Sequence, residues 1–154
     1  MKRIFVTIFF SLFLGLVPQF AEAAFSFSQS GPDDLGDSDL NSLNEFQEFD
    51  GYLYACTQHS TDGLEVWRTQ DPANLSGGAP STVWTKIVDN GFGDSQNGIC
   101  SDFLVFGNEL YLSTQKEVDP GELWKTSTGT SWSKVGSDGF GDPDNFGIGE
   151  LVSF

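Results

Sequence analysis

Beyond residue 35 the chain alternates apolar and polar positions in short runs, and this period of two predicts β-strands. Two hairpins are expected, each made of two such runs around a two-residue turn. The runs are 46–49 and 52–57 around Asp50-Gly51, and 102–106 and 109–114 around Gly107-Asn108. Each hairpin is followed by two further predicted strands, at 64–69 and 83–88 and at 122–126 and 132–135. Helical periodicity is absent over this region, so we expect an all-β fold.

An internal repeat underlies this order of strands. When the chain is shifted by 57 positions, residues 36–69 align with 93–126 without a gap, and thirteen of the aligned pairs are identical. A shift of 48 then aligns 84–106 with 132–154. The two shifts differ because a Gly/Pro/Ser-rich stretch before Trp84 is longer in the first copy, as a surface loop tolerates. The predicted division is a linker at 24–35, a first repeat at 36–92, a second repeat at 93–140 and the start of a third at 141–154.

Each copy has a turn followed by Leu-Tyr, then a strand with one tryptophan, then a turn into a second tryptophan, at 46–88 and again at 103–135. This pattern resembles the blades of kelch-like and Asp-box (sialidase-like) β-propellers. It departs from kelch at Ala55-Cys56-Thr57, where kelch repeats carry paired glycines, and the turn before Trp132 lacks the Asp-box aspartate. The resemblance implies tandem four-stranded antiparallel sheets, about two blades of an incomplete propeller.

The predicted number of blades is too small for a complete propeller. A propeller has about four to eight blades, and stacked repeats bury their apolar faces only together. We therefore expect this chain to be the N-terminal piece of a longer protein, with the remaining blades downstream of Phe154. Two alternatives stay open: a ring assembled from other copies of the chain, and a small twisted domain of two sheets.

The first residues predict an export signal. Lys2 and Arg3 precede an apolar run at 4–17, and Ala21-Glu22-Ala23 has the small-x-small pattern of a cleavage site. We therefore expect a signal peptide at 1–23, with cleavage after Ala23. The alternative of a membrane anchor needs about 20 apolar residues, so no membrane insertion is expected after cleavage, and a secreted (extracellular or periplasmic) protein is predicted.

Charge narrows the classes of partner. The chain has 22 acidic against 7 basic residues, a formal net charge of −15. Such a surface repels phosphate backbones and anionic lipids, so neither nucleic acid nor a membrane surface is an expected partner. Arg68 is the only arginine after the signal, whereas sialidase-type enzymes hold their substrate's carboxylate with several; that activity is not expected in this segment.

A Gly-Phe-Gly-Asp segment occurs twice, each time after the fourth predicted strand of a repeat. Carboxylate and amide oxygens gathered on such a loop are calcium ligands. The calcium candidates are Asp94, Asn97, Asp142, Asp144 and Asn145. The structural alternative, which we favour, is a crossover between repeats in which glycines permit the turn, Phe92 and Phe140 plug between sheets, and the aspartates bond backbone amides. No other cofactor is predicted.

The cysteines, the tryptophans and the single histidine each have a structural interpretation. Cys56 and Cys100 lie in consecutive repeats, and a disulfide between them is one expectation for an exported protein. The tryptophans are interpreted as packing between blades, with a sugar-stacking platform as the alternative. His59 is predicted to be an exposed loop residue between the second and third strands.

No catalytic triad, metal cluster or phosphate-binding loop emerges, so enzyme activity stays uncertain, with the balance against it. The leading hypothesis is a non-enzymatic binding scaffold whose propeller loops hold a glycan or a protein. The alternatives are the N-terminal part of a propeller-fold hydrolase with catalytic residues beyond Phe154, and a purely structural surface repeat.

Overall fold

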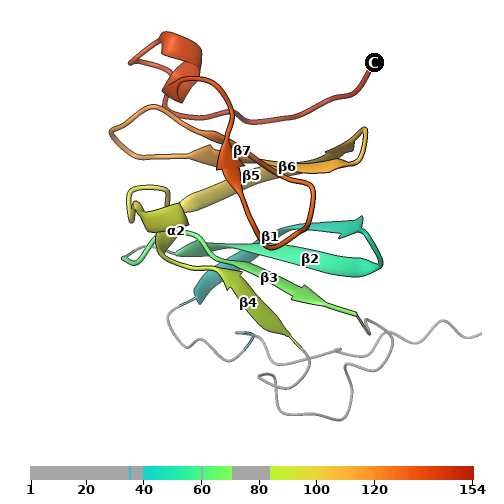
Figure 1. The fold of residues 1–154 in the computed structure, drawn as a ribbon. Helices are drawn as coiled ribbons and strands as arrows, with labels where there is room; N and C mark the ends of the chain where they lie inside the picture. Colours follow the sequence, from blue (N-terminus) through green and yellow to red (C-terminus); the bar gives the residue numbers. More distant parts are fainter. Residues whose placement is uncertain (1–34, 36–39, 60, 71–83) are drawn as a thin grey trace, which may run out of the picture.

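The structure of the protein is a computed structural model that describes residues 35, 40–59, 61–70 and 84–154. Its strands form two groups of four that follow each other along the chain (Figure 1). The first unit consists of β1 (Leu40–Phe49), β2 (Tyr52–His59), β3 (Val66–Thr69) and β4 (Thr85–Val88). The second unit consists of β5 (Ile99–Phe106), β6 (Glu109–Gln115), β7 (Leu123–Thr126) and β8 (Ser133–Lys134).

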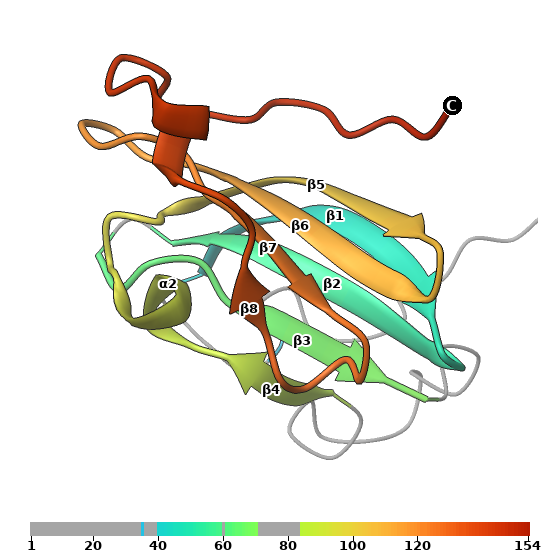
Figure 2. The ribbon, with the colours of Figure 1, turned by 45° about the horizontal axis from the view of Figure 1, so that its top comes forward.

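Each unit is an antiparallel meander in which consecutive strands pair. In the first unit β2 pairs with β1 and β3, and β3 with β4; in the second, β6 pairs with β5 and β7, and β7 with β8. A single bridge, Gln58↔Ile99, joins β2 to β5, so the eight strands form one curled sheet. The prediction of an all-β, antiparallel fold is confirmed. Figure 2 shows the two units lying against each other along their lengths.

The first hairpin turns where the sequence predicts. Phe49 pairs with Tyr52 across two residues, and both of them have positive φ, 50° at Asp50 and 74° at Gly51. This conformation matches the right-handed twist of the flanking strands and is favourable for Asp-Gly. The second hairpin closes in the same way, with Phe106 opposite Glu109.

The strands differ from the predicted ones in length. β1 begins at Leu40, well before residue 46, because its polar residues pair with β2 through two register shifts, between Leu40 and Ser42 and between Leu43 and Glu45. The third and fourth strands are shorter than predicted in both units, and β8 has only two residues. The predicted strand pattern is correct in order and incorrect at its ends.

Two short turns follow the fourth strands. They are α2 (Asn90–Gly93) and η1 (Asp138–Gly141), and both contain residues with positive φ rather than helical backbone. We call 89–97 the first crossover loop and 137–145 the second crossover loop, because each leads out of one unit into the next segment of the chain.

The main core lies between the two units. Tyr54, Val66 and Val88 of the first unit lie in the same buried cluster as Phe103 and Leu112 of the second. Alternate residues of the first unit point the other way. Leu35, Ala55, Trp67 and Trp84 form a second buried cluster on that opposite face. The same period of two that predicts strands thus divides the first unit between two apolar layers.

Some predictions fall outside the described residues: the signal peptide at 1–23 with its cleavage after Ala23, and most of the linker at 24–35. Within the described part of the chain, none of the helices has the length and apolar character needed to cross a membrane.

Candidate functional site

The two crossover loops have the same backbone conformation. In the first, φ is 56° at Gly91, 65° at Phe92 and 93° at Gly93; in the second, the equivalent values are 55°, 58° and 90°. Left-handed backbone is costly for an L-residue such as phenylalanine. Its occurrence at both Phe92 and Phe140 shows that the surrounding bonds fix the loop shape.

Equivalent hydrogen bonds hold both loops against their own units. The Gly91 N–H donates to the Leu64 carbonyl at 3.0 Å, and the Asn97 side chain donates to the Gly91 carbonyl at 3.0 Å. In the second loop the Gly139 N–H donates to the Gly121 carbonyl at 2.8 Å, and the Asn145 side chain donates to the Gly139 carbonyl at 3.3 Å. The two asparagines therefore act as internal braces.

The first crossover loop also reaches into the second unit. The Asn97 Nδ2 donates to Glu122 Oε2 at 2.7 Å, and its Oδ1 accepts from the Thr114 hydroxyl at 2.9 Å. The Phe92 ring stacks on Trp124, with ring centroids 4.2 Å apart and planes 7° from parallel. This loop is thus a clamp between the units.

A buried carboxylate organises the charges at this clamp. Glu122 accepts from Trp124 Nε1 at 2.8 Å and from Lys116 Nζ at 3.0 Å, and Lys134 Nζ lies 3.4 Å from it. Lys116 also binds Asp94 of the first crossover loop at 2.7 Å, although its own side chain is only 4% exposed. The buried ammonium group is therefore shared between two carboxylates, as a buried charge requires.

The pKa values keep this cluster charged near neutral pH. Burial lowers the pKa of Lys116, but its hydrogen bonds to Asp94 and Glu122 outweigh that effect, and the pKa is raised overall. Burial likewise raises the pKa of Glu122, yet its hydrogen bonds prevail and the pKa is lowered. The hydrogen bond from Lys116 lowers the pKa of Asp94, and the hydrogen bond to Asp138 raises the pKa of Lys134.

Above this cluster lies an open hollow of about 450 Å³, which we call the charged hollow. Phe92 and Trp124 supply its aromatic wall. Half-exposed or exposed charges stand around it: Asp94, Asp119, Lys134 and Asp138. Together with Lys116 and Glu122 the lining holds four carboxylates and two ammonium groups, so its field favours neutral or cationic ligands over anions.

The five residues predicted as calcium candidates are divided between the two loops. Asp94 binds Lys116, and its Oδ1 accepts the Gln96 N–H at 3.0 Å. Asp142 accepts the Asp144 N–H in the same way at 3.0 Å. Asn97 and Asn145 brace their loops through the hydrogen bonds to Gly91 and Gly139. Among the described residues, no three His, Cys, Asp or Glu side chains gather closely enough to hold a metal ion.

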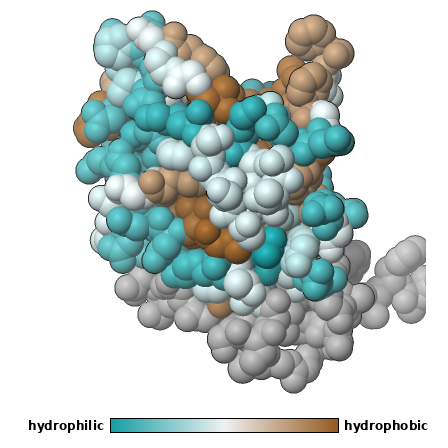
Figure 3. Space-filling view, viewed as in Figure 1, coloured by the Kyte–Doolittle hydropathy of each residue, from teal (hydrophilic) through white to brown (hydrophobic). Residues whose placement is uncertain are grey.

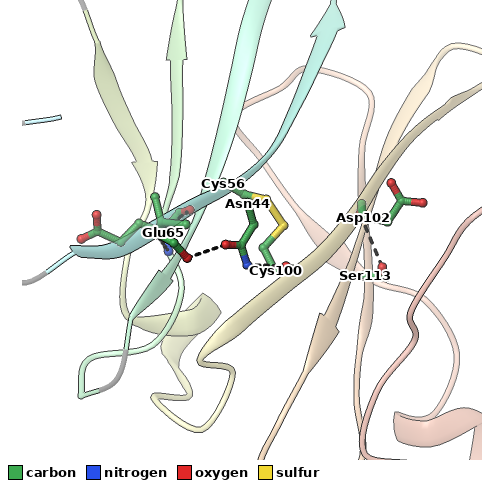
Figure 4. The surroundings of a disulfide bond; sticks show 8 residues. Asn44, Cys56, Glu65, Cys100, Asp102 and Ser113 are labelled. Carbon is green, nitrogen blue, oxygen red and sulfur yellow. Dashed lines mark hydrogen bonds between the residues drawn. A yellow bond between two sulfur atoms is a disulfide. The ribbon is translucent and has the colours of Figure 1, made fainter. Parts of the chain in front are cut away.

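The structure joins Cys56 and Cys100 as a disulfide, with their Cα atoms 6.1 Å apart. Figure 4 shows the bond between β2 and β5, with Asn44 beside it. The Asn44 side chain donates to the Cys100 carbonyl at 3.0 Å. The disulfide and this hydrogen bond therefore connect the two units at the end of the sheet where a single bridge joins β2 to β5.

Two predictions about exposure are wrong. His59 is 3% exposed rather than a loop residue, because β2 extends to it and its N–H donates to the Gly98 carbonyl at 2.9 Å. Phe140 is 61% exposed rather than wedged between sheets, because no described strand lies where Trp124 lies for Phe92. Trp67 and Trp84 are buried, but in the cluster on the face of the first unit opposite the second unit rather than between the two units, whereas Trp124 and Trp132 are half-buried.

A charge motif that the sequence analysis missed organises each unit. Glu65 accepts from Trp67 Nε1 at 2.8 Å and pairs with Lys86, as Glu122 does with Trp124 and Lys134. The signal is visible in the sequence as a repeated Glu-x-Trp followed by Trp-x-Lys, at 65–67 and 84–86 and again at 122–124 and 132–134. Comparing the two repeats shows only that these residues recur at equivalent positions. The structure shows that the glutamate, the first tryptophan and the lysine contact one another in each unit.

Comparison with known proteins identifies no relative: no family model matches the chain, and neither the curated proteins nor the solved structures include a significant match.

Proposed function

We propose that this chain is an exported, non-catalytic, β-propeller-like scaffold that binds a neutral glycan in the charged hollow. The observation that carries the proposal is the lining itself, in which an aromatic wall stands beside half-exposed carboxylates and a lysine. Aromatic faces pack against the apolar faces of sugar rings, and carboxylates accept hydrogen bonds from sugar hydroxyl groups.

The charge balance selects the class of glycan. Four carboxylates against two ammonium groups disfavour sialylated or sulfated sugars. Neutral oligosaccharides would replace water at the rim without introducing a like charge. The Cys56–Cys100 disulfide supports export, since such bonds persist in oxidising compartments, and it agrees with the apolar run and cleavage pattern of residues 4–23.

Binding to an array of neutral and acidic glycans tests the proposal. Neutral oligosaccharides should bind with a Kd on the order of 0.1–1 mM, equivalent to about 4–5.5 kcal/mol, and acidic ones should bind more weakly. Asp119→Ala removes a rim carboxylate that has no described role in the fold and should weaken binding about tenfold.

Glu48→Ala is the matched control, because Glu48 is an exposed acid of β1 outside the hollow. Both variants should unfold at the same denaturant concentration as the parent. Equal loss of affinity in the two variants, or preference for acidic glycans, contradicts the proposed site.

A further inference from the structure

The interface between the two units can be described as three elements. The first is a bridge between strands, Gln58↔Ile99, next to a hydrogen bond from the His59 N–H to the Gly98 carbonyl. The second is the clamp formed by the first crossover loop on Trp124 and its neighbours. The third is an apolar face, in which Phe49 and Tyr54 pack in one cluster with the second unit.

The same apolar face of the second unit is open. Phe106 is the repeat equivalent of Phe49, but it is 57% exposed where Phe49 is 8% exposed. Tyr111 is half-buried where its equivalent, Tyr54, is fully buried. These side chains line a hollow of about 420 Å³ together with Leu104, Leu123 and the C-terminal segment 151–154.

The second crossover loop also carries the parts of the clamp. It has the left-handed backbone and internal bonds of the first loop, and it presents Phe140, Asp142 and Asn145 where the first presents Phe92, Asp94 and Asn97. Within the described residues Phe140 has no ring partner and Asp142 no salt bridge. The second crossover loop therefore already has the shape needed for a ring stack and an ion pair with a neighbouring unit, which among the described residues only the first crossover loop makes.

The bridge is present as well. Gln115 pairs with Gly147, the repeat equivalent of Gln58↔Ile99, and the Lys116 N–H donates to the Phe146 carbonyl at 2.9 Å. The segment 147–154 thus begins beside the second unit as β5 begins beside the first, and the Leu151 N–H bonds Asp102 Oδ2 at 2.7 Å. Both ribbon views show this segment along the side of the second unit that faces away from the first (Figures 1 and 2).

The open apolar face and the C-terminal segment place hydrophobic side chains on the surface of the protein. Part of this hydrophobic surface is visible at the upper right of Figure 3, at the C-terminal end of the chain. Val152 is 70% exposed and Phe154 fully exposed. An apolar face whose repeat equivalent is buried within the same molecule is a surface built for contact.

We infer that this face binds a third four-stranded repeat of the same kind, joined in series to Phe154. The inference rests on the propeller-like part of the proposed function and not on glycan binding. The chemistry of the occupant follows from the first interface: a Glu-x-Trp strand whose tryptophan stacks on Phe140 and whose glutamate accepts from Asn145, a cation that binds Asp142, and two apolar side chains equivalent to Leu110 and Leu112.

A chain extended after Phe154 by a second copy of residues 107–154 tests this, because Phe154 is the repeat equivalent of Phe106. Amide hydrogen exchange in β6 and β7 should slow by about tenfold or more as the face is covered. The matched control carries Leu110→Asp and Leu112→Asp in the appended copy only, and it should restore fast exchange.

Phe140→Ala provides an independent readout. In the 154-residue chain the exposed ring contributes little, so the variant should unfold at the parental denaturant concentration. In the extended chain the same substitution should lower the midpoint and speed exchange at least severalfold, since coupling arises only between contacting residues. Three results would overturn the inference: unchanged exchange in the extended chain, an equal effect of Phe140→Ala in both chains, or sedimentation that shows the 154-residue chain covering this face by dimerising. Glycan binding is measured separately, so its loss leaves this result intact.

Discussion

At the scale of single residues, the buried ammonium group of Lys116 binds two carboxylates at once. It is nearly inaccessible to solvent and joins a carboxylate of the first crossover loop to a buried carboxylate of the second unit. Its repeat equivalent is the buried His59, so the same position holds a nitrogen-bearing side chain in both units. Removing one member of such a buried pair costs more than the pair itself contributes, because the remaining charge is left without compensation.

Lys116→Met should lower the free energy of unfolding by about 3 kcal/mol. The substitution keeps the length of the side chain but leaves Glu122, which is 5% exposed, with Lys134 as its only cation among the described residues. Urea denaturation followed by tryptophan fluorescence measures the effect. Lys125→Met is the matched control, because Lys125 and Glu109 are each about a third exposed and their pair is far more accessible to solvent than that of Lys116. Equal destabilisation in the two variants would contradict the role given to the buried pair.

At the scale of elements, the sequence predicts the order of the strands and the residues of the hairpin turns better than it predicts where each strand begins and ends. Asp50-Gly51 identifies the first hairpin because few dipeptides adopt its two positive φ values. The start of β1 could not be predicted, since its polar residues pair at a sheet edge where no alternation is enforced. The burial of His59 follows from a bond to Gly98, which is distant in the sequence.

The local parts of the candidate site could be predicted from the sequence, whereas the contacts between the two units could not. The repeated Gly-Phe-Gly-Asp segment located both crossover loops and the local bonds of Asp94 and Asp142. The charged hollow could not be predicted, because it brings Phe92 against Trp124 across the two units. Such contacts depend on how the two units pack together. Aligning one repeat with the other shows which residues are equivalent, but not which residues of different units touch.

Gly91 tests how strictly the first crossover loop is shaped. An added Cβ would lie 2.8 Å from Asn97 Cβ and 3.0 Å from the Asn97 carbonyl, at a φ of +56°. Gly91→Ala should therefore cost more than the roughly 1–2 kcal/mol of left-handed backbone alone. Gly107→Ala is the control: its φ is +63° but its Cβ would meet no atom within 4 Å. Thermal unfolding measures the stability of both variants. Equal losses of stability would contradict the prediction and show that the first crossover loop can shift to accommodate the added methyl group.

At the scale of the whole molecule, one covalent bond and one apolar cluster help to hold the two units together, in addition to the strand bridge and the crossover-loop clamp. The Cys56–Cys100 bond closes a loop between residues 44 positions apart. Around it lie Tyr54, Val66 and Phe103, which are nearly or fully buried. A bond that closes a loop of this size restricts the unfolded chain strongly, while the cluster stabilises the folded one.

Replacing both cysteines with serine should lower the free energy of unfolding by about 3–4 kcal/mol. Denaturation of the oxidised parent, the reduced parent and the double variant measures this, and mass spectrometry should show a gain of two hydrogens on reduction of the parent. If the oxidised and reduced proteins unfold at the same denaturant concentration, the cross-link contributes nothing to stability.

The position of this cross-link also sets how the molecule responds to mechanical tension. A pull applied at the two termini passes from residue 56 directly to residue 100 through the sulfur atoms. The 43 residues between them stay out of the load path, and they represent roughly 150 Å of contour length at about 3.5 Å per residue. Under such tension the first unit would lose only β1 and part of β2, while β3, β4 and the first crossover loop remain shielded until the bond is reduced.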